Sequence, residues 1–156
     1  MKGNEEVIQK LDQLLADELT AINQYMVHSE MCANWGYDRL HASVEKRAVQ
    51  EMHHAEKLIA RIIFLEGSPT VSKLNPVGIG ADIPKQLESD LAAEMGAVRA
   101  YNEAIHLADE SGDAVTRTLL EGILKEEDDH VDWLEEQLDQ IAQMGLPMYL
   151  STQTEE

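Results

Sequence analysis

Hydrophobic residues recur three and four positions apart through four long segments of the chain, and an alternating strand pattern is almost absent. This is the spacing of one face of an α-helix. We therefore predict an all-α fold, with helices over about 4–33, 38–66, 84–111 and 114–144. A shorter stretch, LPMYL, follows Gly145 and predicts a brief fifth helix over about 146–152.

Residues that favour helix ends stand at the predicted boundaries. Asn4, Asp38 and Asp113 are placed to cap N-termini, and Pro84 suits the first turn of a helix. Gly36 offers the left-handed conformation in which helices often end. The connections after the first and third helices are short, so each pair is expected to form an antiparallel hairpin.

The segment between the second and third helices reads GSPTVSKLNPVGIGAD, residues 67–82. It is rich in glycine and proline and is longer than most connections in compact domains. Sixteen residues can extend over roughly 50 Å, whereas a helix of about 28 residues is about 42 Å long. The segment can therefore cross the whole length of a bundle. We predict one domain over 1–156, a four-helix bundle of two hairpins joined by one long crossover.

Charge and cysteine content narrow the class of protein. Thirty acidic residues against twelve basic ones give a formal net charge of −18, which argues against nucleic acid or an anionic membrane as partner. The acidity favours cations as partners, although many helical proteins are acidic without binding any. The single cysteine, Cys32, and the lack of a leader or a long apolar run lead us to expect a cytoplasmic protein.

One spacing is repeated in the two halves of the chain. In each half a glutamate is followed after 33 residues by a Glu-x-x-His motif: Glu18 by Glu51 and His54, and Glu94 by Glu127 and His130. A tyrosine follows each leading glutamate by seven residues, Tyr25 in the first half and Tyr101 in the second. All four glutamates fall on the apolar stripes of their predicted helices, so we expect them to face the bundle interior.

Inward glutamates require a partner, because burying an ionised carboxylate costs several kcal/mol unless it is paired or bound to metal. Surface acids usually pair with lysine or arginine, but no basic residue recurs beside all four; Arg47 is the nearest and can serve one. Four carboxylates and two neutral imidazoles carry a formal −4, which two divalent cations cancel. Oxygen and nitrogen ligands without thiolate suit iron or manganese, and zinc less exclusively.

Met52 lies between Glu51 and a histidine pair but points elsewhere. Each helical residue advances about 100°, so the Met52 side chain is turned well away from the Glu51 and His54 face. The matching position of the second half holds Asp128. Met52 is therefore either a packing methionine or a residue of an external interface.

The chain resembles the bacterioferritins, the haem-containing branch of the ferritins, over essentially its whole length. The stretches that carry the resemblance are MKGNEEVIQKLDQLLADEL, AINQY, EMHHAEKLI and EEDDHVDWLEEQLD. It implies a ferritin-like four-helix bundle with a di-iron ferroxidase centre. The implied ligands are Glu18, Glu51, His54, Glu94, Glu127 and His130. Of these, Glu51 and Glu127 would bridge the ions, and Tyr25 would form a hydrogen bond near them and supply an electron.

The resemblance also implies cofactors and partners. Met52 and its symmetry mate would ligate the iron of one haem b, or a related iron porphyrin, between two subunits. Twenty-four subunits would form a shell that stores ferric mineral after O2 or H2O2 has oxidised Fe2+. A ferredoxin or reductase could drive iron release. Neither nucleic acid nor a membrane is expected as a partner.

Some positions depart from the resemblance, and other functions stay open. Lys46 and Gln50 stand where some family members carry additional iron-binding residues, so an auxiliary inner-surface site is not expected. His28, His41 and His106 have no partner at ligand spacing and are assigned to solvent or interfaces. A rubrerythrin-like peroxidase with two irons or manganese ions is one alternative, although one cysteine is too few for its second iron domain. An inert helical scaffold or a haem-binding module is the other.

Overall fold

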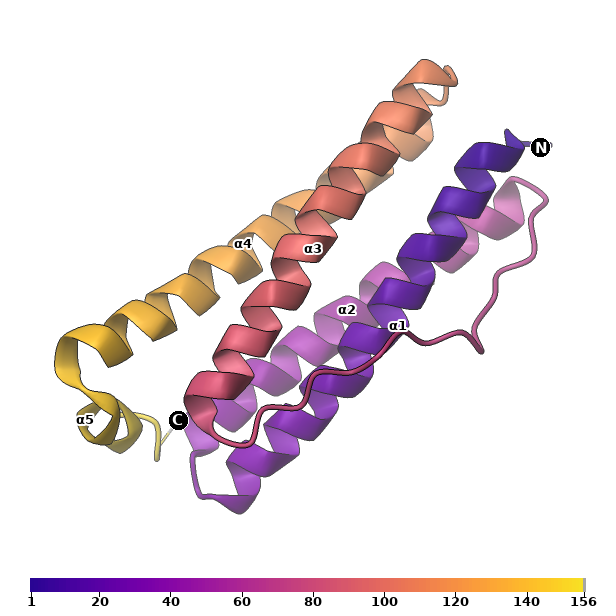
Figure 1. The fold of residues 1–156 in the computed structure, drawn as a ribbon. Helices are drawn as coiled ribbons and strands as arrows, with labels where there is room; N and C mark the ends of the chain where they lie inside the picture. Colours follow the sequence, from indigo (N-terminus) through magenta and orange to yellow (C-terminus); the bar gives the residue numbers. More distant parts are fainter. Residues whose placement is uncertain (156) are drawn as a thin grey trace.

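A computed structural model describes residues 1–155, so Glu156, the last residue of the expected domain, lies outside the described part. The described chain contains no strand, and the all-α prediction is confirmed. Four long helices and a short one follow each other in the order α1 Glu5–Asn34, α2 Asp38–Phe64, α3 Ile83–Glu110, α4 Ala114–Met144 and α5 Leu146–Ser151. Figure 1 shows α1 beside α2 and α3 beside α4, with α5 folded across the end of α4.

Three of the four long helices begin at a side-chain cap. Asn4, Asp82 and Asp113 each accept hydrogen bonds from backbone N–H groups of the first turn, which satisfies donors that have no partner inside the helix. The cap predicted for the second helix is wrong: Tyr37 occupies the N-cap and makes no side-chain bond. Asp38 is instead the first helical residue, where its negative charge still interacts favourably with the positive end of the helix dipole.

Both hairpin turns use a glycine in the left-handed region. Gly36 follows α1 with φ of 83°, and Gly112 follows α3 with φ of 74°. A side chain at either position would be strained by its own Cβ. The glycines therefore allow each pair of helices to reverse within a few residues and to pack antiparallel.

The crossover between α2 and α3 runs along the outside of α1, as Figure 1 shows. Side chains of α1 accept hydrogen bonds from four backbone N–H groups of the crossover, which satisfies donors outside regular structure. The pairs are Thr70 with Asp12, Asn75 with Thr20, Gly78 with Gln24 and Gly80 with His28. The long connection predicted from its length is thus fixed to one helix along most of its path.

His28 is fully buried, and its assignment to solvent or an interface is wrong. Its Nε2 accepts from the Gly80 N–H at 3.0 Å, so the ring proton resides on Nδ1, which donates to Asp90 at 2.9 Å. Gln24 donates to the same Asp90 oxygen at 2.8 Å. This buried polar group links α1, the crossover and α3, and it explains how the crossover is held at its far end.

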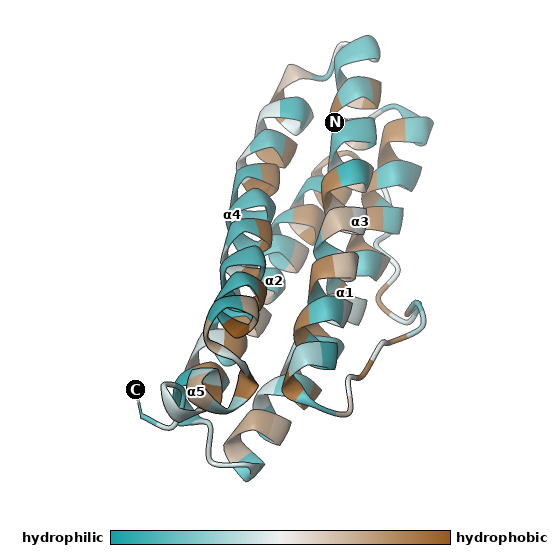
Figure 2. Cartoon of the chain, turned by 60° about the vertical axis from the view of Figure 1, so that its left-hand side comes forward, coloured by the Kyte–Doolittle hydropathy of each residue, from teal (hydrophilic) through white to brown (hydrophobic). Residues whose placement is uncertain are grey.

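The apolar core is divided along the length of the bundle. Hydropathy is highest on the helix faces that look inward (Figure 2). One core cluster includes Leu11, Leu58 and Leu120, and another, toward α5, includes Leu40 and Leu134. On α2 and α4 the residues between these two clusters include the four ligand candidates of the Glu-x-x-His motifs. The polar layer thus lies between two apolar clusters. Among residues 1–155, none of the helices is both long and apolar enough to span a bilayer.

Candidate metal centre

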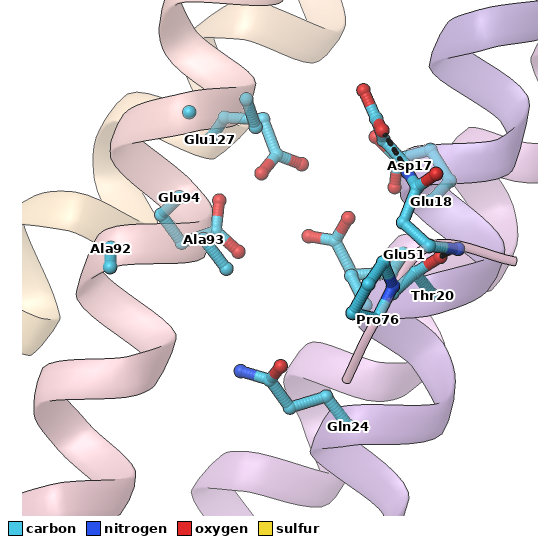
Figure 3. A pocket seen from close by; sticks show the side chains of 14 residues that line it. Asp17, Glu18, Thr20, Gln24, Glu51, Pro76, Ala92, Ala93, Glu94 and Glu127 are labelled. Carbon is cyan, nitrogen blue, oxygen red and sulfur yellow. Dashed lines mark hydrogen bonds between the residues drawn. The ribbon is translucent and has the colours of Figure 1, made fainter. Parts of the chain in front are cut away.

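The four glutamates of the repeat face one another across the middle of the bundle. Figure 3 shows Glu18 and Glu51, from the α1–α2 hairpin, opposite Glu94 and Glu127, from the α3–α4 hairpin. Together with the two histidines of the repeat, none of these side chains is more than 2 % exposed. The expected inward orientation of the glutamates is therefore observed, and all six side chains lie in one buried layer.

These six residues form two overlapping groups of four. The first group is Glu18, Glu51, His54 and Glu127, and the second is Glu51, Glu94, Glu127 and His130. Within each group one ligand atom per residue lies within 4.8 Å of the others. Because Glu51 and Glu127 belong to both groups, each can bridge two ions. The arrangement has the ligands to hold two metal ions, with one histidine at each position.

Both histidines direct Nδ1 toward the centre. His54 donates from Nε2 to Glu126 Oε2 at 2.5 Å, and His130 donates from Nε2 to Gln50 Oε1 at 2.9 Å. The Gln50 oxygen also accepts from Arg47 at 2.8 Å, which identifies it as the oxygen end of the amide. With Nε2 bonded to an acceptor, Nδ1 of each ring is the nitrogen that can offer a lone pair to a metal when the ring is neutral.

The polar atoms that face the centre lack hydrogen-bond partners. The unpaired buried atoms include Nδ1 of both histidines and at least one carboxylate oxygen of each glutamate. His54 Nδ1 lies 2.7 Å from a Glu127 oxygen, but without hydrogen-bond geometry. Among the described residues, no lysine or arginine forms an ion pair with the four glutamates; Arg47 instead binds Gln50 and stacks over Trp133. Such a set of unpaired ligand atoms fits a pair of divalent cations.

Two tyrosines hold the outer glutamates in a crossed arrangement. Tyr25 of α1 donates to Glu94 of α3, and Tyr101 of α3 donates to Glu18 of α1 at 2.6 Å. Burial, with the charge of the nearest glutamate, raises the pKa of both hydroxyls well above 10, so both remain protonated donors. Each tyrosine therefore fixes a carboxylate supplied by the opposite hairpin.

Crowding and burial shift the pKa values of three side chains at the centre upward. Burial and the neighbouring Glu18 raise the pKa of Glu51 well above its usual range. Burial and the neighbouring carboxylate of Glu94 do the same for Glu127. Burial alone would lower the pKa of His54, but the neighbouring carboxylates of Glu127 and Glu18 raise it to about 10. These are the shifts expected where anionic ligands are crowded together without their cation.

A cavity of about 340 Å³ reaches the centre between α1, the crossover and α3. All four glutamates contribute to its lining, and Asp17, Gln24, Asn75 and Pro76 line it from α1 and the crossover. Figure 3 shows Asp17 and Pro76 beside Glu18 on this side. Asp17 accepts a hydrogen bond from Asn75 at 2.6 Å. The cavity provides space for small reactants beside the carboxylates.

The chain matches known proteins over this whole arrangement. A family model of the ferritin-like domain matches residues 8–144. The bacterioferritin of Brucella melitensis biotype 1 is 42 % identical over 149 residues, which cover 96 % of this chain and 92 % of that protein. The chain belongs to the bacterioferritins, within the ferritin family. The bacterioferritin of Rhodobacter capsulatus is 41 % identical (93 % and 90 % covered), and the bacterial ferritin of Paramagnetospirillum magnetotacticum is 40 % identical (97 % and 94 %).

In this bacterioferritin chain Met52 lies outside the centre. Its side chain is 45 % exposed on α2, on the face turned away from Glu51 and His54. Met26 of α1 is exposed as well. The outward direction expected from helical geometry is thus observed, and the assignment of Met52 to haem stays a prediction.

Three residues beside the centre were not expected as site residues: Tyr101, Gln50 and Glu126. Tyr101 matches Tyr25 in the repeat, and this equivalence could have identified it. Gln50 and Glu126 each precede a bridging glutamate by one residue, so they too are equivalent positions. Their role is visible only in the structure, since each supports a histidine of the other hairpin.

Proposed function

We propose that the chain is a ferroxidase that oxidises Fe2+ to Fe3+ at the buried dinuclear centre. The ligands are the six residues of the two overlapping groups, Glu18, Glu51, His54, Glu94, Glu127 and His130. The observation that carries this proposal is the set of unpaired ligand atoms on all six, buried where no lysine or arginine neutralises them. Membership of the ferritin family supports iron as the metal.

The ligand set suits oxidation of iron rather than simple binding. Anionic carboxylate oxygens stabilise Fe3+ more than Fe2+, and the imidazoles complete the ligand set. Two Fe2+ ions side by side give up one electron each. The pair reduces O2 to H2O2, or H2O2 to two water molecules, with uptake of two protons in either case. Carboxylates that bridge both ions keep the two electron donors adjacent.

The protein side chains have distinct tasks in this reaction. Glu51 and Glu127 bind both ions, and the histidines bind one each through Nδ1. Tyr25 keeps Glu94 in place beside the centre through its hydrogen bond. The apolar clusters on either side limit the water that reaches the reacting ions.

We further propose that the ferric product is stored inside a shell of 24 subunits in the cytoplasm. The names of the relatives and the ferritin-like domain support iron storage. Met52 would ligate a haem, haem b or a related iron porphyrin, together with Met52 of a second copy. Electrons for iron release would enter from a ferredoxin or a reductase, and the acidity of the chain would attract Fe2+.

A direct test is to add Fe2+ to the metal-free protein in air or with H2O2 and to follow ferric absorbance. We expect rapid oxidation of Fe2+. The ferric product should stay in solution and elute together with the protein assembly in size-exclusion chromatography. Glu18→Ala and His130→Ala should reduce the initial rate by at least tenfold. An inert scaffold would oxidise iron no faster than buffer. A rubrerythrin-like peroxidase would turn over H2O2 without retaining iron.

A further inference from the structure

The two histidines at the centre are equivalent in the repeat but are supported differently. His54 donates to a carboxylate, Glu126, whereas His130 donates to an amide, Gln50. Gln50 and Glu126 occupy the same position of the repeat, one residue before a bridging glutamate. The six side chains are therefore arranged almost symmetrically, but the hydrogen-bond acceptors of the two histidines differ.

The carboxylate makes His54 the stronger ligand. An imidazole whose N–H donates to an anionic oxygen gains electron density at its other nitrogen, and so binds a cation more tightly. The acceptor of His54 is an ionisable carboxylate and that of His130 is a neutral amide, and hydrogen bonds to ionised acceptors are roughly twice as strong as those to neutral ones. The negative charge of Glu126 also favours a cation at the same position.

The amide makes His130 the weaker ligand. Gln50 carries no charge, and its oxygen is shared with the Arg47 guanidinium at 2.8 Å. That cation withdraws electron density from the oxygen that supports His130, and its positive charge opposes metal binding at this position. Both effects act in the direction opposite to that of Glu126.

We propose that Glu126 and Gln50 are positioning residues that make the two metal positions unequal, so that the His54 position fills first and the His130 position second. This inference rests on the proposed dinuclear centre. It assigns the order of loading to two residues that touch no metal. The position of Glu18, Glu51, His54 and Glu127 is the high-affinity one, and the position that includes Glu94 and His130 has the lower affinity.

Both residues can be changed without disturbing the core. The Glu126 side chain is 43 % exposed, and Gln50 is half-buried. Both line the same open groove on the α2–α4 face, together with His53 and Lys57. Glu126→Gln keeps the shape and an acceptor oxygen but removes the charge. Gln50→Glu introduces the charge at the equivalent position.

The test is an anaerobic titration of the metal-free protein with Co2+, followed by visible absorbance and by calorimetry. The wild-type protein should bind two equivalents per chain in two resolved steps. Glu126→Gln should weaken the first step by about 10–100-fold and leave the second within about threefold, so that the steps merge. Gln50→Glu should strengthen the second step, by less because Arg47 neutralises part of the added charge. His54→Ala should remove the tight step and His130→Ala the weak one.

Glu136→Gln is the matched control, since Glu136 is an exposed carboxylate of the same helix; both steps should keep their wild-type affinities. The proposal is overturned if the two steps are equal in the wild-type protein, or if Glu126→Gln leaves the first step unchanged or weakens both steps alike. Failure to bind two equivalents at all would instead reject the dinuclear centre itself.

Discussion

Tyr101 of α3 donates its buried hydroxyl to Glu18 of α1 across the middle of the bundle. This bond leaves the second Glu18 oxygen without a partner and directed into the centre. Tyr25 makes the reciprocal bond to Glu94. The two hairpins are thereby connected by a pair of crossed hydrogen bonds that hold the outer carboxylates ready for metal.

Replacing Tyr101 by phenylalanine should destabilise the metal-free protein by about 1–3 kcal/mol, because a buried carboxylate oxygen loses its donor. With Zn2+ bound the loss should be smaller, since the ion compensates Glu18. Urea denaturation with and without Zn2+ measures both values. An equal loss in the two states would show that the hydroxyl supports the fold and not the ligand.

The metal-free protein should lose stability as pH rises from about 5 to 8. The pKa of Glu51, of Glu127 and of His54 is raised in the folded state, so the folded chain holds protons that the unfolded chain has released. The pKa of Glu94 is lowered in the folded state, so ionised Glu94 contributes stability above about pH 4.5. This contribution is lost only as the pH falls below that value.

Melting temperatures measured in EDTA at pH 5, 6.5 and 8 should therefore decrease. In excess Zn2+ the trend should reverse, because the ion binds the deprotonated ligands. The double variant Glu51→Gln, Glu127→Gln should flatten the decrease seen in EDTA. A metal-free protein that is most stable at pH 8 would contradict the protonation of the centre.

His28→Leu should destabilise the protein by about 2–4 kcal/mol, since Asp90 and the Gly80 N–H would both lose a buried partner. The crossover should also become a site of proteolysis near Gly80. His106→Ala is the control, because the His106 side chain is 74 % exposed and its change should cost less than about 0.5 kcal/mol. Denaturation midpoints and limited proteolysis of the three proteins decide the outcome.

Met52→Ala should abolish haem binding without slowing iron oxidation, because the Met52 side chain leaves the helix on the face opposite the centre. Soret absorbance after haem addition and the initial rate of Fe2+ oxidation measure the two properties. Met148→Ala removes another exposed methionine, on α5, and should change neither. Retention of haem by Met52→Ala would remove this residue from the interface assigned to it.

The helices and the six clustered side chains could be predicted because both depend on local periodicity. A carboxylate within an apolar stripe is visible without knowing its neighbours, and the repeat supplied a second, independent copy. The supports of the histidines could not be predicted in the same way. Gln50 and His130 are 80 residues apart, and Glu126 and His54 are 72 apart, so neither contact follows from helical spacing.

The error at His28 has the same origin. Its acceptor Asp90 is 62 residues away, and its donor belongs to the glycine-rich crossover, where the sequence indicates no regular structure. A histidine without a neighbour at ligand spacing is therefore expected in solvent or at an interface, although long-range contacts bury His28. The misplaced cap at Asp38 is a shift of one residue, within the usual uncertainty of helix boundaries.

Each hairpin contributes three of the six inward side chains: Glu18, Glu51 and His54 from one, and Glu94, Glu127 and His130 from the other. Two metal ions bound among these side chains would cross-link the two hairpins near the middle of the bundle, where the polar layer separates the two apolar clusters. Metal binding should then slow amide hydrogen exchange in all four long helices at once. The bound iron would thus stabilise the same bundle that holds it.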